Sequence, residues 1–183
     1  MATAAQTVVP ALASFNPAVN SADGTTPVAV AVGDLNGDPN PDAALADYDS
    51  NSVSILFGAG DGTLSAGPTY PVGKGPSAIL AADFNHNGKL DLAVVNSGAK
   101  SVSILIGNGT GTFVIASLLH TDSGPSAVAA GDFNGDGQVD LAVTNRISDS
   151  VSIFLGTGSG TFIAGSTFSV GNGPVAIAAG DFN

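Results

Sequence analysis

The sequence predicts an all-β protein, a partial β-propeller built from four-stranded antiparallel blades. Two observations lead to this prediction. A repeat of 49 residues runs through most of the chain, as the spacing of Asp34, Asp83, Asp132 and Asp181 shows. Each repeat contains four short strand-like segments, and no segment has the apolar period of a helix. A period near 50 residues with four strands per unit is typical of a propeller blade. It favours a propeller over a β-solenoid, whose coils are usually shorter.

The first strand of each repeat is rich in alanine and runs into an aspartate. It is expected at 28–34, 78–83, 127–132 and 176–181. In a propeller the first strands converge on the axis, where small side chains fit. The second strand follows the aspartate motif and is expected at 42–47, 91–96 and 140–145.

The third strand alternates between its two faces and is expected at 52–57, 101–106 and 150–155. In its second copy, Val102, Ile104 and Ile106 share one face, and Ser101, Ser103 and Leu105 share the other. The fourth strand begins at Leu64, Phe113 and Phe162 and is the least regular. Most phenylalanines keep the phase of the repeat, which indicates packing between blades; the set is Phe57, Phe84, Phe133, Phe154 and Phe182.

The repeats cover residues 15–183, because Phe15 has the same phase as Leu64, and residues 1–14 form an N-terminal lead-in. Residues 15–183 make about three blades and the first strand of a fourth. Three blades do not close a ring, since propellers carry about four to eight. We therefore interpret the chain as a fragment of a longer propeller. Its open strand edges and blade faces predict self-association.

The composition excludes several functions. Apolar residues make up 44% of the chain and charged residues only 10%, with four basic residues and a net charge of −11. This charge disfavours nucleic acid, whose phosphates would be repelled. There is no apolar run of about 18 residues for a membrane span. The chain has no Cys or Glu and no nucleophile motif, so we expect no enzymatic activity.

All fifteen acidic residues are Asp, and nine of them lie in a loop that follows the first strand. This loop has Asp or Asn at positions 1, 3 and 5 and Asp at position 9. Such oxygen ligands, with a main-chain carbonyl at position 7, suit calcium. The predicted ligands are Asp34, Asn36, Asp38, Asn40 and Asp42 in the first loop, Asp83, Asn85, Asn87, Lys89 and Asp91 in the second, and Asp132, Asn134, Asp136, Gln138 and Asp140 in the third.

An EF-hand and a set of simple Asx turns both fit the loop less well than a propeller calcium site. An EF-hand requires a bidentate Glu at position 12 and flanking helices, but position 12 holds Leu45, Val94 or Val143. Asx turns account for one or two polar residues per loop, but not for three acids within nine residues. The third loop matches the calcium pattern best. The second has Asn87 at position 5, and the first has Pro39 where a glycine would permit a sharp turn.

The stretch "GDFNGDGQVDLAVTN" at 131–145, followed by "SVSIFLGTGSGTF" at 150–162, resembles the FG-GAP or VCBS repeat. This repeat is the unit of integrin α-chain propellers and of many secreted bacterial proteins. The resemblance implies calcium bound between the first two strands of a blade. It also implies a secreted or cell-surface, integrin-like module for adhesion or for binding a protein or glycan. Two alternatives remain open, an ancillary propeller of a secreted polysaccharide-degrading enzyme and a structural spacer.

A few loop residues have no counterpart of the same type in the other repeats. Tyr48 and Arg146 are the main examples. Because a binding surface would diverge between repeats, these two residues and their neighbours are surface candidates. His86 is expected to be exposed without a special role.

Overall fold

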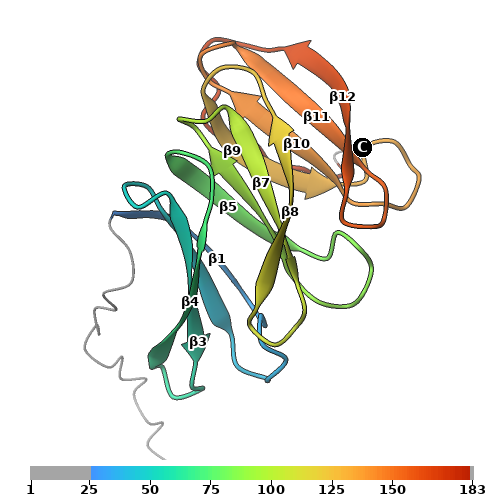
Figure 1. Ribbon diagram of the computed structural model, residues 1–183. Helices are drawn as coiled ribbons and strands as arrows, with labels where there is room; N and C mark the ends of the chain where they lie inside the picture. Colours follow the sequence, from blue (N-terminus) through green and yellow to red (C-terminus); the bar gives the residue numbers. More distant parts are fainter. Residues whose placement is uncertain (1–25, 182–183) are drawn as a thin grey trace, which may run out of the picture.

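The computed structural model describes residues 26–181, which form three four-stranded antiparallel sheets and no helix (Figure 1). The first sheet contains β1 (Pro27–Gly33), β2 (Asp42–Asp47), β3 (Ser52–Gly58) and β4 (Leu64–Pro71). The second contains β5 (Pro76–Ala82), β6 (Asp91–Asn96), β7 (Ser101–Gly107) and β8 (Phe113–His120). The third contains β9 (Pro125–Gly131), β10 (Asp140–Asn145), β11 (Ser150–Gly156) and β12 (Phe162–Ser169).

Within each sheet the strands lie in chain order, so every connection joins neighbours. The prediction of four-stranded antiparallel blades is therefore confirmed. None of the described residues belongs to a helix that could cross a membrane. The predicted lead-in 1–14, the start of the repeats at 15–25 and the last two residues, 182–183, lie outside the described part of the chain.

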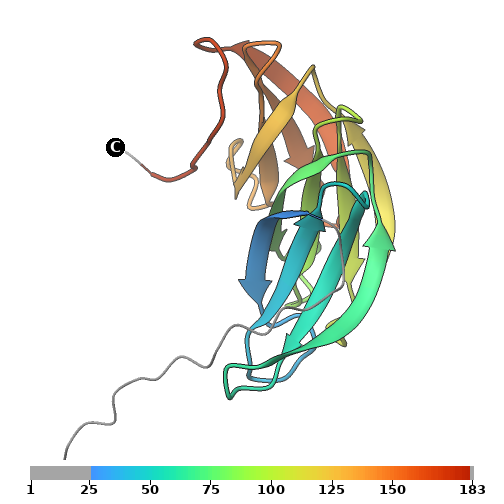
Figure 2. The same cartoon turned by 90° about the vertical axis from the view of Figure 1, so that its left-hand side faces the viewer.

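The three sheets, here called blades 1 to 3, stand side by side in an arc (Figures 1 and 2). Their first strands are neighbours, since β1 contacts β5 and β5 contacts β9. These strands form the inner edge of the arc, as the small side chains of "SAVAAG" and its equivalents predict. The arc is open between blade 3 and blade 1 within residues 26–181, which agrees with the prediction of a partial propeller.

Two apolar cores hold the blades together, one at each junction. Between blades 1 and 2, residues such as Val53 and Ile55 pack against Leu92 and Leu105. The core between blades 2 and 3 is made chiefly of Phe84, Val95, Val102, Ile104, Leu141, Val143 and Phe154. Blade 2 is thus covered on both faces, because its third strand sends alternate side chains to the two cores. The predicted division of faces in this strand is confirmed.

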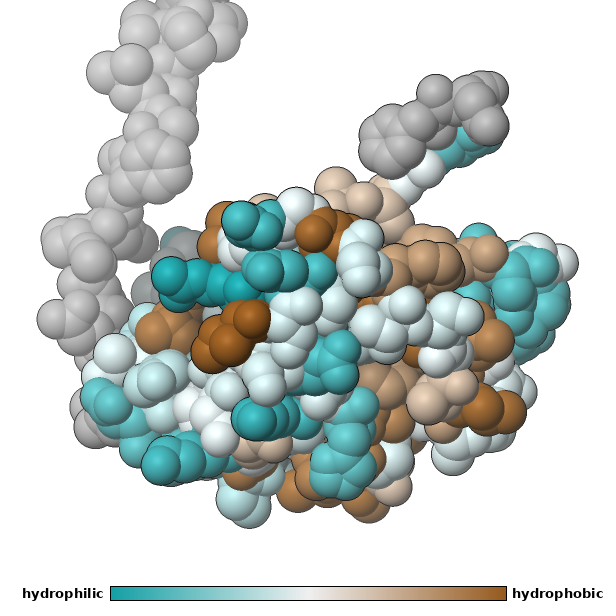
Figure 3. All heavy atoms as spheres, turned by 90° about the horizontal axis from the view of Figure 1, so that it is seen from above, coloured by the Kyte–Doolittle hydropathy of each residue, from teal (hydrophilic) through white to brown (hydrophobic). Residues whose placement is uncertain are grey.

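The outer faces of blades 1 and 3 lack such a neighbour. Phe133 of blade 3 is 44% exposed, whereas the equivalent Phe84 of blade 2 is 1% exposed. Phe168 is likewise 56% exposed, against 8% for the equivalent Leu119. Hydrophobic atoms reach the surface in several places between hydrophilic ones (Figure 3). The prediction that phased phenylalanines pack between blades therefore holds for Phe57, Phe84 and Phe154. It is wrong for Phe133, because no described blade follows blade 3, and Phe182 lies outside the described residues.

This difference leads to a stability prediction with a matched control. Phe84→Ala is expected to lower the free energy of unfolding by about 3–5 kcal/mol, since it leaves a cavity in a closed core. Phe133→Ala removes the same atoms from a site that is exposed in the single chain, and it is expected to cost less than about 1 kcal/mol at protein concentrations low enough to keep the chain monomeric. Urea denaturation of both variants measures the two values. Equal losses would show that Phe133 is covered in solution.

The predicted first strand of a fourth blade, 176–181, does not pair with any of the three sheets. The chain instead leaves blade 3 and runs on the concave side of the arc (Figure 2). It stays close to β9, because the Ser126 hydroxyl donates a hydrogen bond to the Pro174 carbonyl at 2.9 Å. An ideal Cβ on Gly131 would lie 3.5 Å from the Cβ of Ala179. A strand forms only with a partner for its N–H and C=O groups, and none of the three described sheets offers this segment one.

Candidate metal-binding loops

The fifteen predicted ligands lie in three equivalent loops at one end of the blades. Each loop joins the first strand of a blade to the second, between β1 and β2, β5 and β6, and β9 and β10. The last predicted ligand of each loop is the first residue of the second strand. The sheet therefore anchors both ends of every loop.

Each loop curls around the carboxylate at position 1. In the third loop, the carboxylate of Asp132 accepts hydrogen bonds from the N–H groups of Gly135, Asp136 and Gly137, at 2.7, 3.2 and 2.9 Å. These bonds, above all the one from Gly137, hold the pKa of Asp132 below its ordinary value. The site thus favours the charged form of this side chain.

The side chains at positions 3 and 5 accept hydrogen bonds in the same way. Asn134 Oδ1 accepts the N–H of Asp136 at 2.9 Å, and Asp136 Oδ1 accepts the N–H of Gln138 at 2.8 Å. The Asn134 amide also donates to Asp136 Oδ2 at 3.0 Å. Asx turns are therefore present in the loop. They do not exclude a cation, since a carboxylate has about four lone-pair sites.

The aspartate at position 9 has a structural role that the spacing of the motif did not predict. Asp140 is fully buried; its Oδ2 accepts the N–H of Phe133 at 2.9 Å and its Oδ1 accepts the N–H of Gly156 at 2.8 Å. Asp42 and Asp91 are buried and bonded in the same pattern. This side chain ties the loop to the end of the third strand. The recurrence of a glycine sixteen residues after it was the available signal.

Burial of the second loop's aspartate has an electrostatic consequence. Desolvation raises the pKa of Asp91 above its ordinary value, although the N–H groups of Gly107 and Phe84 oppose this shift. The negative charge of Asp83 adds to the increase. Ionisation of Asp91 is therefore less favourable in the fold than in water, and a nearby positive charge would oppose this shift.

The backbone turns of the loops separate the first loop from the other two. Position 6 has a positive φ at Gly88 and Gly137, at 77° and 81°, where the residue also donates its N–H to the aspartate at position 1. Pro39 has neither property. In the first loop only Gly37 has a positive φ, at 86°. It therefore turns differently, as the proline predicts.

Position 4 also needs a positive φ, which the motif alone did not predict. Gly37 and Gly135 satisfy it, but in the second loop the residue is His86, with φ of 58°. His86 Nε2 lies 2.9 Å from Gln138 Oε1, so the second and third loops are linked. His86 is exposed, as expected, but its positive φ and its contact with Gln138 were not expected.

The comparisons with known proteins agree with this repeated geometry. The model of the FG-GAP-like repeat matches the chain three times, over residues 34–94, 83–143 and 132–183. The chain belongs to the FG-GAP-like repeat family. Each matched stretch begins at the position 1 aspartate of a loop and extends to the second strand of the following copy where that copy is present. The loops described above are thus the recurring feature of these FG-GAP-like repeats.

Solved structures show the same fold at low sequence identity. A functionally unknown protein from Desulfotomaculum acetoxidans DSM 771 is 18% identical, with a TM-score of 0.62; the match covers 86% of this chain and 48% of that one. Two structures of BBS1N in complex with ARL6DN, soaked with mercury or lead, are each 19% identical. Their TM-scores are 0.57 and 0.58, and the matches cover 85% and 88% of this chain and 47% and 50% of theirs. This FG-GAP-like chain therefore spans about half the length of these structures.

No curated protein matches the chain.

The FG-GAP-like loops offer few carboxylates as metal ligands. Residues 26–181 contain no group of three or more His, Cys, Asp or Glu side chains arranged to hold a metal ion. In the second loop this follows from composition, because it has only two carboxylates, Asp83 and Asp91. A cation in these FG-GAP-like loops would need amide and main-chain oxygens beside the carboxylates.

The divergent residues Tyr48 and Arg146 lie at the opposite end of the blades. Each follows a second strand, whereas the candidate metal-binding loops precede it. The structure brings these two residues of different FG-GAP-like repeats to one pocket. No predicted metal ligand lines that pocket.

Proposed function

We propose that this chain is a calcium-stabilised propeller module that binds an external partner and has no catalytic activity of its own. The observation that carries the proposal is the threefold recurrence of an oxygen-lined loop whose carboxylates accept hydrogen bonds only from N–H groups. Asp132 and Asp136 illustrate it, since backbone and amide N–H groups are their partners. Binding is favoured over catalysis, because the acids are spread over three equivalent loops instead of converging in one cleft.

The donor atoms are of the type that calcium binds, although the carboxylates of residues 26–181 do not converge on a single point without the cation. In the third loop the cation would be held by Asp132, Asn134, Asp136, the Gln138 carbonyl and Asp140, all of which offer oxygen. In the second loop a cation would also offset the desolvation that raises the pKa of Asp91. Calcium would supply charge neutralisation and rigidity; the chain itself has already curled each loop through its hydrogen bonds.

We further propose a secreted or cell-surface location, in a bacterial protein. The loop ligands Asp132, Asn134 and Asp136 are exposed, and each loop has only two or three carboxylates. Such sites fit the affinities of extracellular calcium modules, with dissociation constants of about 10⁻⁴ to 10⁻³ M. The partner is a protein or a glycan.

Calorimetric titration with calcium tests the metal assignment and ranks the loops. We expect the third loop to be tightest and the first weakest, because Pro39 lacks the N–H and the positive φ that position 6 supplies elsewhere. Asp136→Ala should weaken the tightest site by about tenfold or more, the loss of one charged ligand interaction. Pro39→Gly should tighten the first loop. No heat of binding in the unmodified chain would refute the calcium proposal, and a tightest first loop would refute the role given to Pro39.

We also propose that residues 1–183 self-associate when expressed alone. Phe133 and Phe168 form an exposed apolar face on blade 3, where the equivalent side chains of blade 2 are buried by the next blade. Sedimentation is expected to show dimers or larger species, and Phe133→Asp with Phe168→Asp to shift them toward monomer. Val114→Asp is the control, since Val114 is 70% exposed on the outer strand of blade 2. A monomeric unmodified chain would contradict this proposal.

A further inference from the structure

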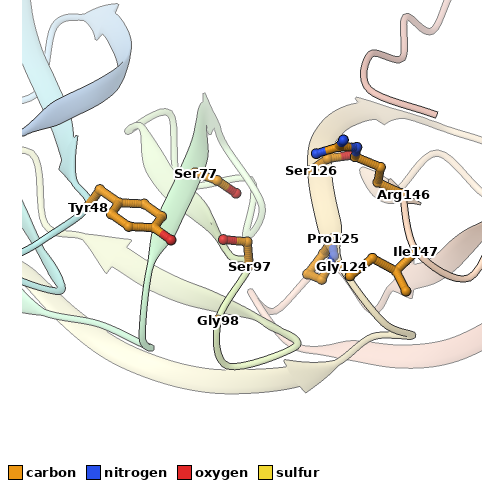
Figure 4. A pocket seen from close by; sticks show the side chains of 9 residues that line it. All are labelled: Tyr48, Ser77, Ser97, Gly98, Gly124, Pro125, Ser126, Arg146 and Ile147. Carbon is orange, nitrogen blue, oxygen red and sulfur yellow. The ribbon is translucent and has the colours of Figure 1, made fainter. Parts of the chain in front are cut away.

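A pocket of about 370 Å³ lies between the three blades (Figure 4). It is formed by the turns after the second strands and by the starts of the first strands, at the end of the blades opposite the candidate metal-binding loops. We call it the inner turn pocket. Blade 1 contributes Tyr48, blade 2 contributes Ser77 and Ser97, and blade 3 contributes Ser126 and Arg146. Its size is in the range of small-ligand sites, about 300–1,000 Å³. The side chains of Tyr48, Ser97 and Arg146 project into the space between the blades (Figure 4).

The repeat places three different side chains at one equivalent position around this pocket. Tyr48, Ser97 and Arg146 are each separated by 49 residues. Their N–H groups bond to the carbonyls of Thr26, Gly75 and Gly124 at 3.0, 2.8 and 2.8 Å. The backbone is therefore the same in each blade, and only the side chain changes. A purely structural turn would not need an aromatic ring in one blade and a guanidinium in another.

Arg146 supplies an unused positive charge. Its side chain is exposed, and no described residue pairs with its guanidinium. Arginine remains charged at all relevant pH values and matches a carboxylate in two parallel hydrogen bonds. The net charge of −11 opposes a phosphate monoester, which carries about two negative charges, more strongly than a carboxylate, which carries one.

The charge around this end of the blades is more balanced than at the metal-binding loops. Lys74 and Lys100 lie on turns at the same end as Arg146, together with three aspartates of the turns, Asp49, Asp122 and Asp149. The other end holds the loop aspartates and a single lysine, Lys89. An anionic ligand would therefore be accepted at the inner turn pocket and repelled at the loops.

The serines of the pocket require a ligand that brings hydrogen-bond donors. The Ser97 hydroxyl donates to the Gly75 carbonyl at 2.8 Å, and the Ser126 hydroxyl donates to the Pro174 carbonyl at 2.9 Å. Their protons are used within the protein. The Ser126 oxygen also lies 2.9 Å from Thr144 Oγ1 and accepts its proton, which leaves Ser126 one lone pair and Ser97 two lone pairs for a ligand. Tyr48 is 44% exposed and can cover an apolar ring face. Sugar hydroxyls, a sugar ring and a carboxylate together match these three requirements.

We propose that the inner turn pocket binds an acidic saccharide, a uronate-containing glycan. Arg146 binds the carboxylate, Tyr48 packs on a sugar ring, and Ser97 and Ser126 accept bonds from its hydroxyls. A peptide fits less well, because its carbonyls would need several N–H donors and Arg146 is the only cationic donor that lines the pocket. This proposal rests on the proposed binding function and names its ligand class and site.

The test measures binding of trigalacturonate to the full chain in calcium by calorimetry or ligand-observed NMR. Its trimethyl ester is the uncharged probe, and an aspartate-rich peptide is the competing class. Arg146→Gln and the ester are each expected to weaken binding about tenfold or more, the loss of one charge-assisted pair. Tyr48→Ala should weaken both the acid and the ester. Lys100→Gln is the control, because it removes the same charge at the same end but outside the pocket, and it should change binding less than about twofold.

The outcomes separate this inference from the proposed function. Binding of trigalacturonate that Arg146→Gln does not weaken, or equal binding of the peptide, would overturn the saccharide assignment and leave a binding module. Absence of any binding while calcium still stabilises the fold would also overturn it, without touching the calcium proposal. Unchanged saccharide binding in a chain that calcium does not stabilise would support the pocket and refute the calcium proposal alone.

Discussion

Chelation of calcium is expected to lower the unfolding temperature of this protein by roughly 10–20 °C. At a calcium concentration a hundredfold above the dissociation constant, each site contributes about 2.7 kcal/mol. Two loops have a glycine at position 6, Gly88 or Gly137. Calcium in both loops would together raise the free energy of unfolding by about 5 kcal/mol. For a chain of this length each kcal/mol shifts the midpoint by about 2–4 °C. Part of the effect is relief of repulsion, since the two bound ions would bring the net charge from −11 to −7.

Thermal melts with calcium and with a chelator measure this shift. The matched control is a chain with Asp83→Ala and Asp136→Ala, which loses a ligand in each of these two loops and should melt at nearly the same temperature in both solutions. Superimposable curves for the unmodified chain would refute calcium stabilisation. A shift that persists in the double variant would place the responsible ion elsewhere.

Asp140→Ala is expected to lower the free energy of unfolding by about 3–5 kcal/mol even in chelator. The substitution leaves the N–H groups of Phe133 and Gly156 without their acceptor. Each unsatisfied buried group costs about 1–3 kcal/mol, and the small side chain adds a cavity. Asp140→Asn keeps one acceptor oxygen and should lose less.

The exposed ligand of the same loop is the control for this experiment. Asp136→Ala should leave stability in chelator nearly unchanged, within about 0.5 kcal/mol as for most surface substitutions, while it reduces the stabilisation by calcium. Urea denaturation in chelator and in calcium compares the two variants. If Asp140→Ala were harmless in chelator, the residue would be a metal ligand alone and the bonds described here would not contribute to the fold.

Much of the fold could be predicted because its signals are local. The twelve strands fall where alternation and turn formers placed them, and the second strands of 42–47, 91–96 and 140–145 match the structure in full. The segment 176–181 was the exception. It has the sequence of a first strand, but a strand also needs a neighbour to bond with, and local sequence contains no information on whether that neighbour is present.

In the loops, too, some features could be predicted from the sequence and others depend on how the strands and blades pack. The spacing of Asp and Asn identified the oxygen-lined loops, and Pro39 correctly separated the first loop from the others. The hydrogen bonds of Asp140 to Phe133 and Gly156 could not be read from spacing, because they join a loop to a strand that lies beside it only after the sheet has formed. The link between His86 and Gln138 depends in turn on the packing of two blades.

The repeat, the blade, the family and the position of every oxygen-lined loop could be predicted from the sequence alone, because they depend on the local pattern of each 49-residue unit and on its recurrence. Which equivalent residues are buried, and which residues lie close together, depends on how the blades pack. Phe84 and Phe133 both lie in an Asp-Phe-Asn sequence, but Phe84 is buried and Phe133 is exposed, because burial depends on the blade that follows. Tyr48 and Arg146 are 98 residues apart and line one pocket, because the arc brings the turns of successive blades to the same inner end.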